Sequence, residues 1–167
     1  DTSFGGDGKV TTGTTSSHDY GLGVALRSGK VVVGGYGRNI STGVEYFALT
    51  RYTSTGALDS TFNGSGIVVT SIGGTEDRIH ALAIQGDGKI LVGGSVSNGT
   101  TENWAFARYL SGGAFDYSFG DDGRVTMSLS VSGEQVQDLV IRSTAILAGG
   151  YAESTYLPRF AVAKLHL

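Results

Sequence analysis

Cysteine is absent from this 167-residue chain and proline occurs once. Without cysteine, disulfide frameworks, thiolate zinc sites and cysteine nucleophiles are excluded. Charged residues are only 16% of the chain and the net charge is −3, which excludes the basic footprint of a nucleic-acid-binding protein. No run of 18 apolar residues occurs, so we expect no membrane insertion. The chain shows no signal peptide and does not begin with Met, so we expect a processed product or an excerpt.

Glycine, by contrast, is abundant, at 28 of 167 residues against a background of about 7%. The glycines follow no three-residue period and almost no proline accompanies them, which excludes collagen. Hydrophobic residues are 40% of the chain, too many for a disordered protein. The composition therefore indicates strands joined by glycine-rich turns.

A set of landmarks occurs three times in the same order, which is the signature of a repeat protein. Each copy opens on Asp-x-Ser/Thr-Phe, continues to a double glycine and then to an aromatic-Ala strand that ends in Arg or Lys. The opening motifs are Asp1–Phe4, Asp59–Phe62 and Asp116–Phe119. We predict one repeat domain over residues 1–167, with repeats at 1–58, 59–115 and 116–167.

Each copy contains four strand-like runs, which in the first copy are residues 9–15, 20–27, 30–37 and 45–52. The third run is apolar throughout, so both faces of the middle strands are expected to be buried. This favours an all-β fold of three tandem four-stranded antiparallel blades, a half or segment of a β-propeller. A two-sheet sandwich is the weaker alternative because it would leave each sheet one polar face.

The motifs of the second copy resemble those of the delta-60 repeat, a β-propeller-type repeat of bacterial surface and secreted proteins. They are Asp59–Phe62, Asp87-Gly88-Lys89-Ile90 and Phe106-Ala107-Arg108-Tyr109. The third copy departs most from the pattern, with Ala145 for Lys and Lys164-Leu165 for Arg-Tyr. The resemblance implies a propeller fold and an extracellular or cell-surface location. It supplies no shared catalytic residues.

Three blades are fewer than the four to eight of closed propellers, so two apolar blade faces would be left uncovered. Two chains joined head to tail would make a six-bladed ring, and many joined without closing would make a filament. The third possibility is an excerpt of a longer propeller. For assembly, we expect Asp1 and Phe4 of one chain to meet Lys164 and Leu165 of the next.

A charge pattern supports this expectation. Arg51 precedes Asp59 by eight residues, and Arg108 precedes Asp116 by eight. Lys164 has no such aspartate after it and Asp1 has no such cation before it, so we predict that the two pair between chains. The alternative is that these are solvated surface charges worth about 0–1 kcal/mol each.

The sequence predicts neither catalysis nor a cofactor. His18, His80 and His166 occupy different repeat positions, with no recurring carboxylate spacing, so we predict no metal site. The Asp-Gly pairs are typical of hairpin turns rather than calcium loops. We therefore predict a non-enzymatic extracellular structural or interaction module that self-assembles head to tail.

A glycan- or ligand-binding propeller is the alternative. Tyr36 and Tyr151 follow the double glycine in two copies and are the candidate ligand-binding residues. Three Asn-x-Ser/Thr sequences suggest glycosylation, at Asn39, Asn63 and Asn98. The aromatic residues Phe47, Trp104 and Phe160 share one repeat position, and we expect all three in the core.

Overall fold

The computed structural model describes residues 1–15, 18–130, 133–143, 145–154 and 157–166. Over these ranges it contains eleven strands and no helix, which confirms the predicted all-β class. The strands are β1 (His18–Arg27), β2 (Lys30–Arg38), β3 (Glu45–Tyr52), β4 (Ile67–Thr70), β5 (Glu76–Ile84), β6 (Ile90–Ser97), β7 (Glu102–Tyr109), β8 (Arg124–Met127), β9 (Glu134–Arg142), β10 (Ala145–Ser154) and β11 (Leu157–His166). No helix within those ranges is long and apolar enough to cross a membrane.

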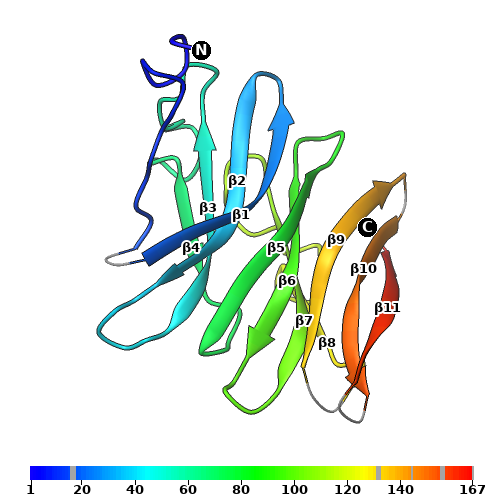
Figure 1. Ribbon diagram of the computed structural model, residues 1–167. Helices are drawn as coiled ribbons and strands as arrows, with labels where there is room; N and C mark the ends of the chain where they lie inside the picture. The colour runs from blue at the N-terminus through cyan, green and yellow to red at the C-terminus, as the bar shows by residue number, and fades with distance from the viewer. Residues whose placement is uncertain (16–17, 131–132, 144, 155–156, 167) are drawn as a thin grey trace.

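The strands form three antiparallel meanders that follow one another across the molecule (Figure 1). We call β1–β4 the first blade, β5–β8 the second blade and β9–β11 the third blade. A single parallel bridge between Glu45 and Glu76 connects the first two blades into one sheet. The open row of blades agrees with the predicted segment of a propeller.

The outermost strand of a blade comes from the next sequence repeat. β4 belongs to the second repeat but pairs with β3, and β8 belongs to the third repeat but pairs with β7. In the described residues the third blade has three strands, and its outermost position, which a following repeat fills in the other two blades, holds none. The prediction of a strand at residues 9–15 is wrong, since these residues form none. Their pairing partner would be the third strand of a preceding blade.

Glycine pairs allow the first two strands of each blade to approach closely at a β-bulge. The second glycine of each pair faces a carbonyl oxygen: a Cβ there would lie 1.7 to 2.1 Å from it. These contacts are Gly35 to Tyr20, Gly94 to Arg78 and Gly150 to Gln135. The double glycines therefore allow close packing of the two backbones.

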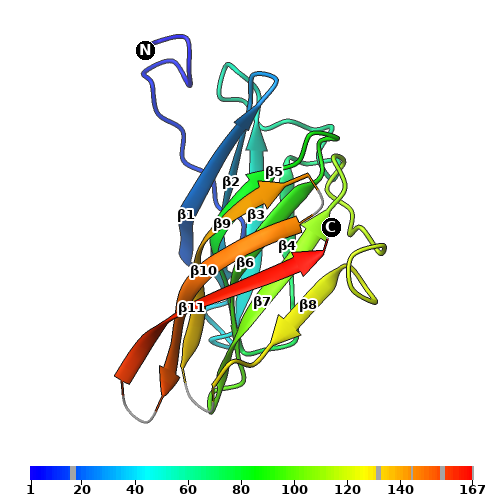
Figure 2. The same ribbon diagram turned by 90° about the vertical axis from the view of Figure 1, so that its right-hand side faces the viewer.

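The hydrophobic core lies between blades. One buried cluster joins residues of the first and second blades, and another joins the second and third. Figure 2 looks onto the third blade, with β9, β10 and β11 in front of the other strands. Each internal junction is therefore a sheet-on-sheet contact, and the two ends of the row are the faces without such a contact.

Candidate assembly interface

Each blade presents three side chains toward the next blade, which we call its knobs. The knobs of the first blade are Val32, Phe47 and Leu49, those of the second are Leu91, Trp104 and Phe106, and those of the third are Leu147, Phe160 and Val162. The knobs of the first two blades are at most 1% exposed and belong to the two core clusters. They are the side chains that hold successive blades together.

The knobs of the third blade are uncovered. Phe160 is 104% exposed, whereas Phe47 and Trp104 at the same repeat position are 1% and 0% exposed. Val162 is 77% exposed. The expectation that Phe160 lies in the core is wrong, because a fourth blade would have to cover it.

The first blade carries the matching cavity, which we call the socket. It has a volume of about 330 Å³ and is lined by residues including Phe4, Val10, Val33, Ala48 and Tyr52. In the second repeat, residues at these repeat positions belong to the same core cluster as the knobs of the first blade. They are Phe62, Val68, Val92, Ala105 and Tyr109. The socket is thus the position that the knobs of a preceding blade would occupy.

Apolar side chains beside the socket are also exposed. Val24 and Leu26 on β1 are 68% and 70% exposed. Their counterparts in the second blade, Leu82 and Ile84, pack against the core cluster of the first junction. The two end faces of the row therefore expose complementary parts of one repeated junction.

The space around the first glycine of each pair also differs between the internal junctions and the open face of the third blade. A Cβ on Gly34 would lie 2.8 Å from Leu82, and one on Gly93 would lie 3.1 Å from Leu139. A Cβ on Gly149, the equivalent in the third blade, would meet nothing within 4 Å. Gly149 leaves room for a neighbour that the single chain does not supply.

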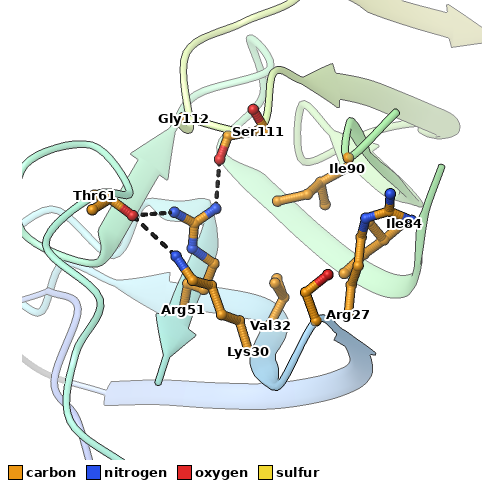
Figure 3. A pocket seen from close by; sticks show the side chains of 11 residues that line it. Arg27, Lys30, Val32, Arg51, Thr61, Ile84, Ile90, Ser111 and Gly112 are labelled. Carbon is orange, nitrogen blue, oxygen red and sulfur yellow. Dashed lines mark hydrogen bonds between the residues drawn. The ribbon is translucent and has the colours of Figure 1, made fainter. Parts of the chain in front are cut away.

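A buried charge cluster fastens the first junction, and Figure 3 shows how its Arg51 and Lys30 both reach the hydroxyl of Thr61. Asp59 Oδ2 lies 2.7 Å from Arg51 Nε and 2.7 Å from Lys30 Nζ. Arg51 also donates to Thr61 and to the carbonyl of Ser111 in the second blade, beside a cavity of about 400 Å³. Arg51 and Asp59 are both buried, so this ion pair is shielded from solvent.

The second junction repeats the cluster. Asp116 Oδ2 lies 2.7 Å from Arg108 Nε and 3.0 Å from Lys89 Nζ. The hydrogen bonds of Lys30 and Thr61 hold the pKa of Asp59 far below its usual range. Burial acts to raise the pKa of Asp116, but hydrogen bonds from Ser118 and Lys89 outweigh it and that pKa is also lowered. Both carboxylates stabilise the fold above about pH 4, and this contribution is lost as the pH falls through their lowered pKa values.

Asp1 and Lys164, at the two ends of the row, occupy the repeat positions of Asp59 and Arg51 in the first cluster. Asp1 Oδ1 accepts from the backbone N–H of Ser3 at 2.9 Å and from its hydroxyl at 2.7 Å. Asp59 holds Thr61 in the same way, at 3.1 and 2.7 Å. Within the described ranges neither Asp1 nor Lys164 forms an ion pair, and both are exposed. Their pairing between chains stays a prediction.

Phe4 and Leu165, the other two predicted interface residues, lie in different settings. Phe4 is half-buried and lines the socket, whereas Phe62 and Phe119 at its repeat position are buried. Leu165 instead belongs to the core of the second junction. Because its side chain points away from the open face, Leu165 is not available to a second chain.

The two tyrosines predicted to bind a ligand lie on different blades. Tyr36 stacks on Tyr20, with ring centroids 4.7 Å apart, and burial raises its pKa. Tyr151 donates to Gln135 at 3.2 Å and lines a cavity of about 570 Å³ together with Phe160. The structure does not bring Tyr36 and Tyr151 into one cavity. Tyr36 lines the socket of the first blade, and Tyr151 lies beside the open face of the third blade.

The asparagines of the three Asn-x-Ser/Thr sequences all lie in turns. The side-chain oxygens of Asn39 and Asn98 accept from backbone N–H groups two and three residues on. Asn63 adopts a positive φ of 52° and its amide donates to the carbonyl of Ile67. Turn geometry thus accounts for these residues, and their glycosylation stays a prediction, which an intact mass would test.

His80, one of the three histidines weighed for metal binding, lies instead at the junction of the second and third blades. Its Nδ1 lies 2.9 Å from the side-chain nitrogen of Gln135. Burial, and to a lesser degree the charge of Arg78, lowers the pKa of His80 to about 4. In the part of the chain that the structure describes, no group of three His, Asp or Glu residues is placed to hold a metal.

Comparison with known families agrees with this architecture. Residues 26–62 and 85–119 match the family model described as domain of unknown function (DUF5122) beta-propeller. Both segments end at the phenylalanine of an Asp-x-Ser/Thr-Phe motif, where an internal blade junction is fastened. The match supports a β-propeller-type repeat. No curated protein matches the chain.

Apart from Phe4, the residues of the knobs and of the socket were not among the predicted interface residues. The signal was present, because superposing the three repeats places Leu147 and Val162 at positions that are buried in the other copies. What the repeat alone does not indicate is which end face carries the knobs and which the socket.

Proposed function

We propose that this chain is a structural propeller module that assembles head to tail, with the knobs of one copy seated in the socket of the next. The single observation that carries the proposal is the exposure of Phe160, whose counterparts in the other two blades are completely buried. Burying a side chain of this size contributes about 1.5–3 kcal/mol. A heterologous contact of this kind makes either a six-bladed ring of two chains or an open filament.

The buried charges support a structural role rather than an enzymatic one. Arg51, Asp59, Arg108 and Asp116 are used to fasten junctions, and Asp77 accepts from backbone N–H groups of the preceding loop. The proposal includes membership of the delta-60 repeats and an extracellular or cell-surface location, which rest on the repeat motifs alone.

The test is the particle mass of the purified chain, measured by sedimentation across a range of concentrations. We expect multiples of 17.2 kDa, either two chains or a long polymer visible in electron micrographs. Phe160→Asp should give single chains. Tyr117→Asp is the matched control, because Tyr117 is an exposed aromatic residue outside the knobs and the socket. A wild-type chain that stays single at all concentrations would overturn the proposal.

A second candidate function is glycan binding at the third blade. Tyr151 and Phe160 lie opposite each other in the register of β10 and β11 and line the same cavity. Aromatic faces of this kind stack on sugar rings. A glycan array run with wild type and Phe160→Asp distinguishes the two functions, since only glycan binding predicts a sugar signal that Phe160→Asp removes.

A further inference from the structure

The segment that precedes the first blade is folded as an inter-blade connection. The N–H of Gly5 donates to the carbonyl of Thr55 at 3.0 Å, just as the N–H of Asn63 donates to that of Gly112 at 2.8 Å in the second copy. The N–H of Gly8 closes a turn onto the carbonyl of Phe4 at 2.7 Å. Residues 66 and 62 close the same turn at the same distance.

The C-terminal end of this segment is held by hydrogen bonds to Asp19. Asp19 accepts from the N–H of Thr15 at 3.1 Å and from the hydroxyl of Thr14. In the second copy Asp77, at the same repeat position, accepts from the N–H of Gly74 at 3.1 Å. Residues 9–12 are therefore held at both flanks as in the inner copies, yet they form no strand.

In the second and third repeats, the residues equivalent to 9–12 form the strands β4 and β8, each paired with a neighbouring strand. In β4, Val68 lies opposite Leu49, and Val69 lies opposite Ala48. β8 pairs with β7 in the same register. The third blade offers an equivalent edge: in the described part of the chain β11 pairs with β10 alone. An unpaired sheet edge is a template for strand addition.

We infer that residues 9–12 of a second copy of this chain add to β11 as the fourth strand of the third blade. The repeat register places Thr11 opposite Ala161 and Val10 opposite Val162. The same placement brings Asp1 of the second copy to Lys164, as Asp59 meets Arg51. The occupant is a second copy because one chain carries both halves of this junction in matching register. The inference rests on the proposed head-to-tail assembly and specifies how the two copies are joined.

Cysteine cross-linking tests the register, since the chain has no cysteine of its own. Thr11→Cys and Ala161→Cys are purified as separate variants, mixed and oxidised, and the disulfide-linked dimer is measured before and after reduction. The control mixture pairs Thr11→Cys with Val162→Cys. Position 162 is more exposed than position 161 but points to the opposite face of the strand, so random collisions would favour the control.

We expect at least a tenfold excess of linked dimer for the pair 11 and 161 over the pair 11 and 162. The particle mass of the wild-type chain is measured alongside. Large particles without this excess overturn the strand addition and leave head-to-tail assembly standing. Single chains of 17.2 kDa at all concentrations overturn both.

Discussion

The junction between the second and third blades and the outer face of the third blade use the same repeat positions in two different states. At the junction, Trp104 is buried and its indole N–H donates to the carbonyl of Tyr151 at 3.1 Å. On the outer face, Phe160 projects into solvent. The comparison teaches that a repeat position does not fix the environment of its residue, because the neighbouring blade supplies half of the contacts.

The largest expected difference between the two regions comes from truncating a knob. Trp104→Ala should lower the free energy of unfolding by about 3–5 kcal/mol, since it leaves a cavity in a packed junction. Phe160→Ala should change it by less than about 0.5 kcal/mol in single chains, because the side chain is fully exposed and buries little apolar surface. Urea unfolding at high dilution checks both. Equal losses for the two variants would contradict the comparison.

Next in size is the effect of neutralising the aspartate of a charge cluster. Asp116→Asn should cost about 3 kcal/mol, because it leaves Arg108 buried without its anionic partner. Asp1→Asn should leave the stability of the single chain unchanged and weaken assembly instead. Chemical unfolding and sedimentation of both variants separate the two effects. A stability loss for Asp1→Asn as large as that for Asp116→Asn would show that Asp1 already has a partner within its own chain.

A smaller difference in the free energy of unfolding is expected when the first glycine of a pair is replaced on β6 or on β10. Gly93→Val places a side chain against Leu139 and Val136, at 3.1 Å from each for its Cβ alone, and should cost about 1–3 kcal/mol. Gly149→Val meets open space and should leave single chains as stable as the wild type. In assembled protein, the same substitution should shift particles toward single chains. Thermal unfolding and sedimentation measure these two outcomes.

The sequence alone predicted much of the fold, because its repeats carry the information three times. The apolar run Val31-Val32-Val33 predicted strands with two buried faces, and the spacing of Arg51 and Asp59 predicted a charge pairing that the structure shows to be buried. Residues 9–15 were predicted as a strand from the same pattern, and here the prediction was wrong. A strand needs a hydrogen-bonding partner, and the described part of the chain places no strand beside residues 9–12.

The candidate site was less accessible to sequence reasoning. Leu165 was assigned to the interface together with Lys164, but neighbouring residues of a strand point to opposite faces. Phe160 was assigned to the core by its equivalence with Trp104. Both errors have one physical cause: side-chain direction and the presence of a neighbouring blade decide exposure, and neither is a property of the repeat motif.

The smallest expected effect is the pH dependence of stability that His80 causes. The first and third repeats have Leu22 and Gln137 at the position of His80. Burial lowers the pKa of His80 to about 4, from 6.5 in an unfolded chain. A lowered pKa means that the folded protein binds the proton less well than the unfolded one. The contribution of His80 to stability is therefore complete above about pH 6.5 and is lost as the pH falls toward 4. Protonation of Nδ1 would also oppose the side-chain amide of Gln135.

Between pH 7 and pH 4.5, this titration should destabilise the wild-type chain by an amount on the order of 1 kcal/mol, since partial exposure of the ring reduces the full effect of its pKa shift. His80→Gln should remove that part of the pH dependence and leave the rest, which urea unfolding at the two pH values measures. The contact between chains has Gln137 at the equivalent position, on the open face of the third blade, so its strength should not follow the titration of His80. Particles that come apart at pH 4.5 in the wild type but not in His80→Gln would mean that His80 also supports the contact between chains, and that the internal and external junctions differ less than their burial indicates.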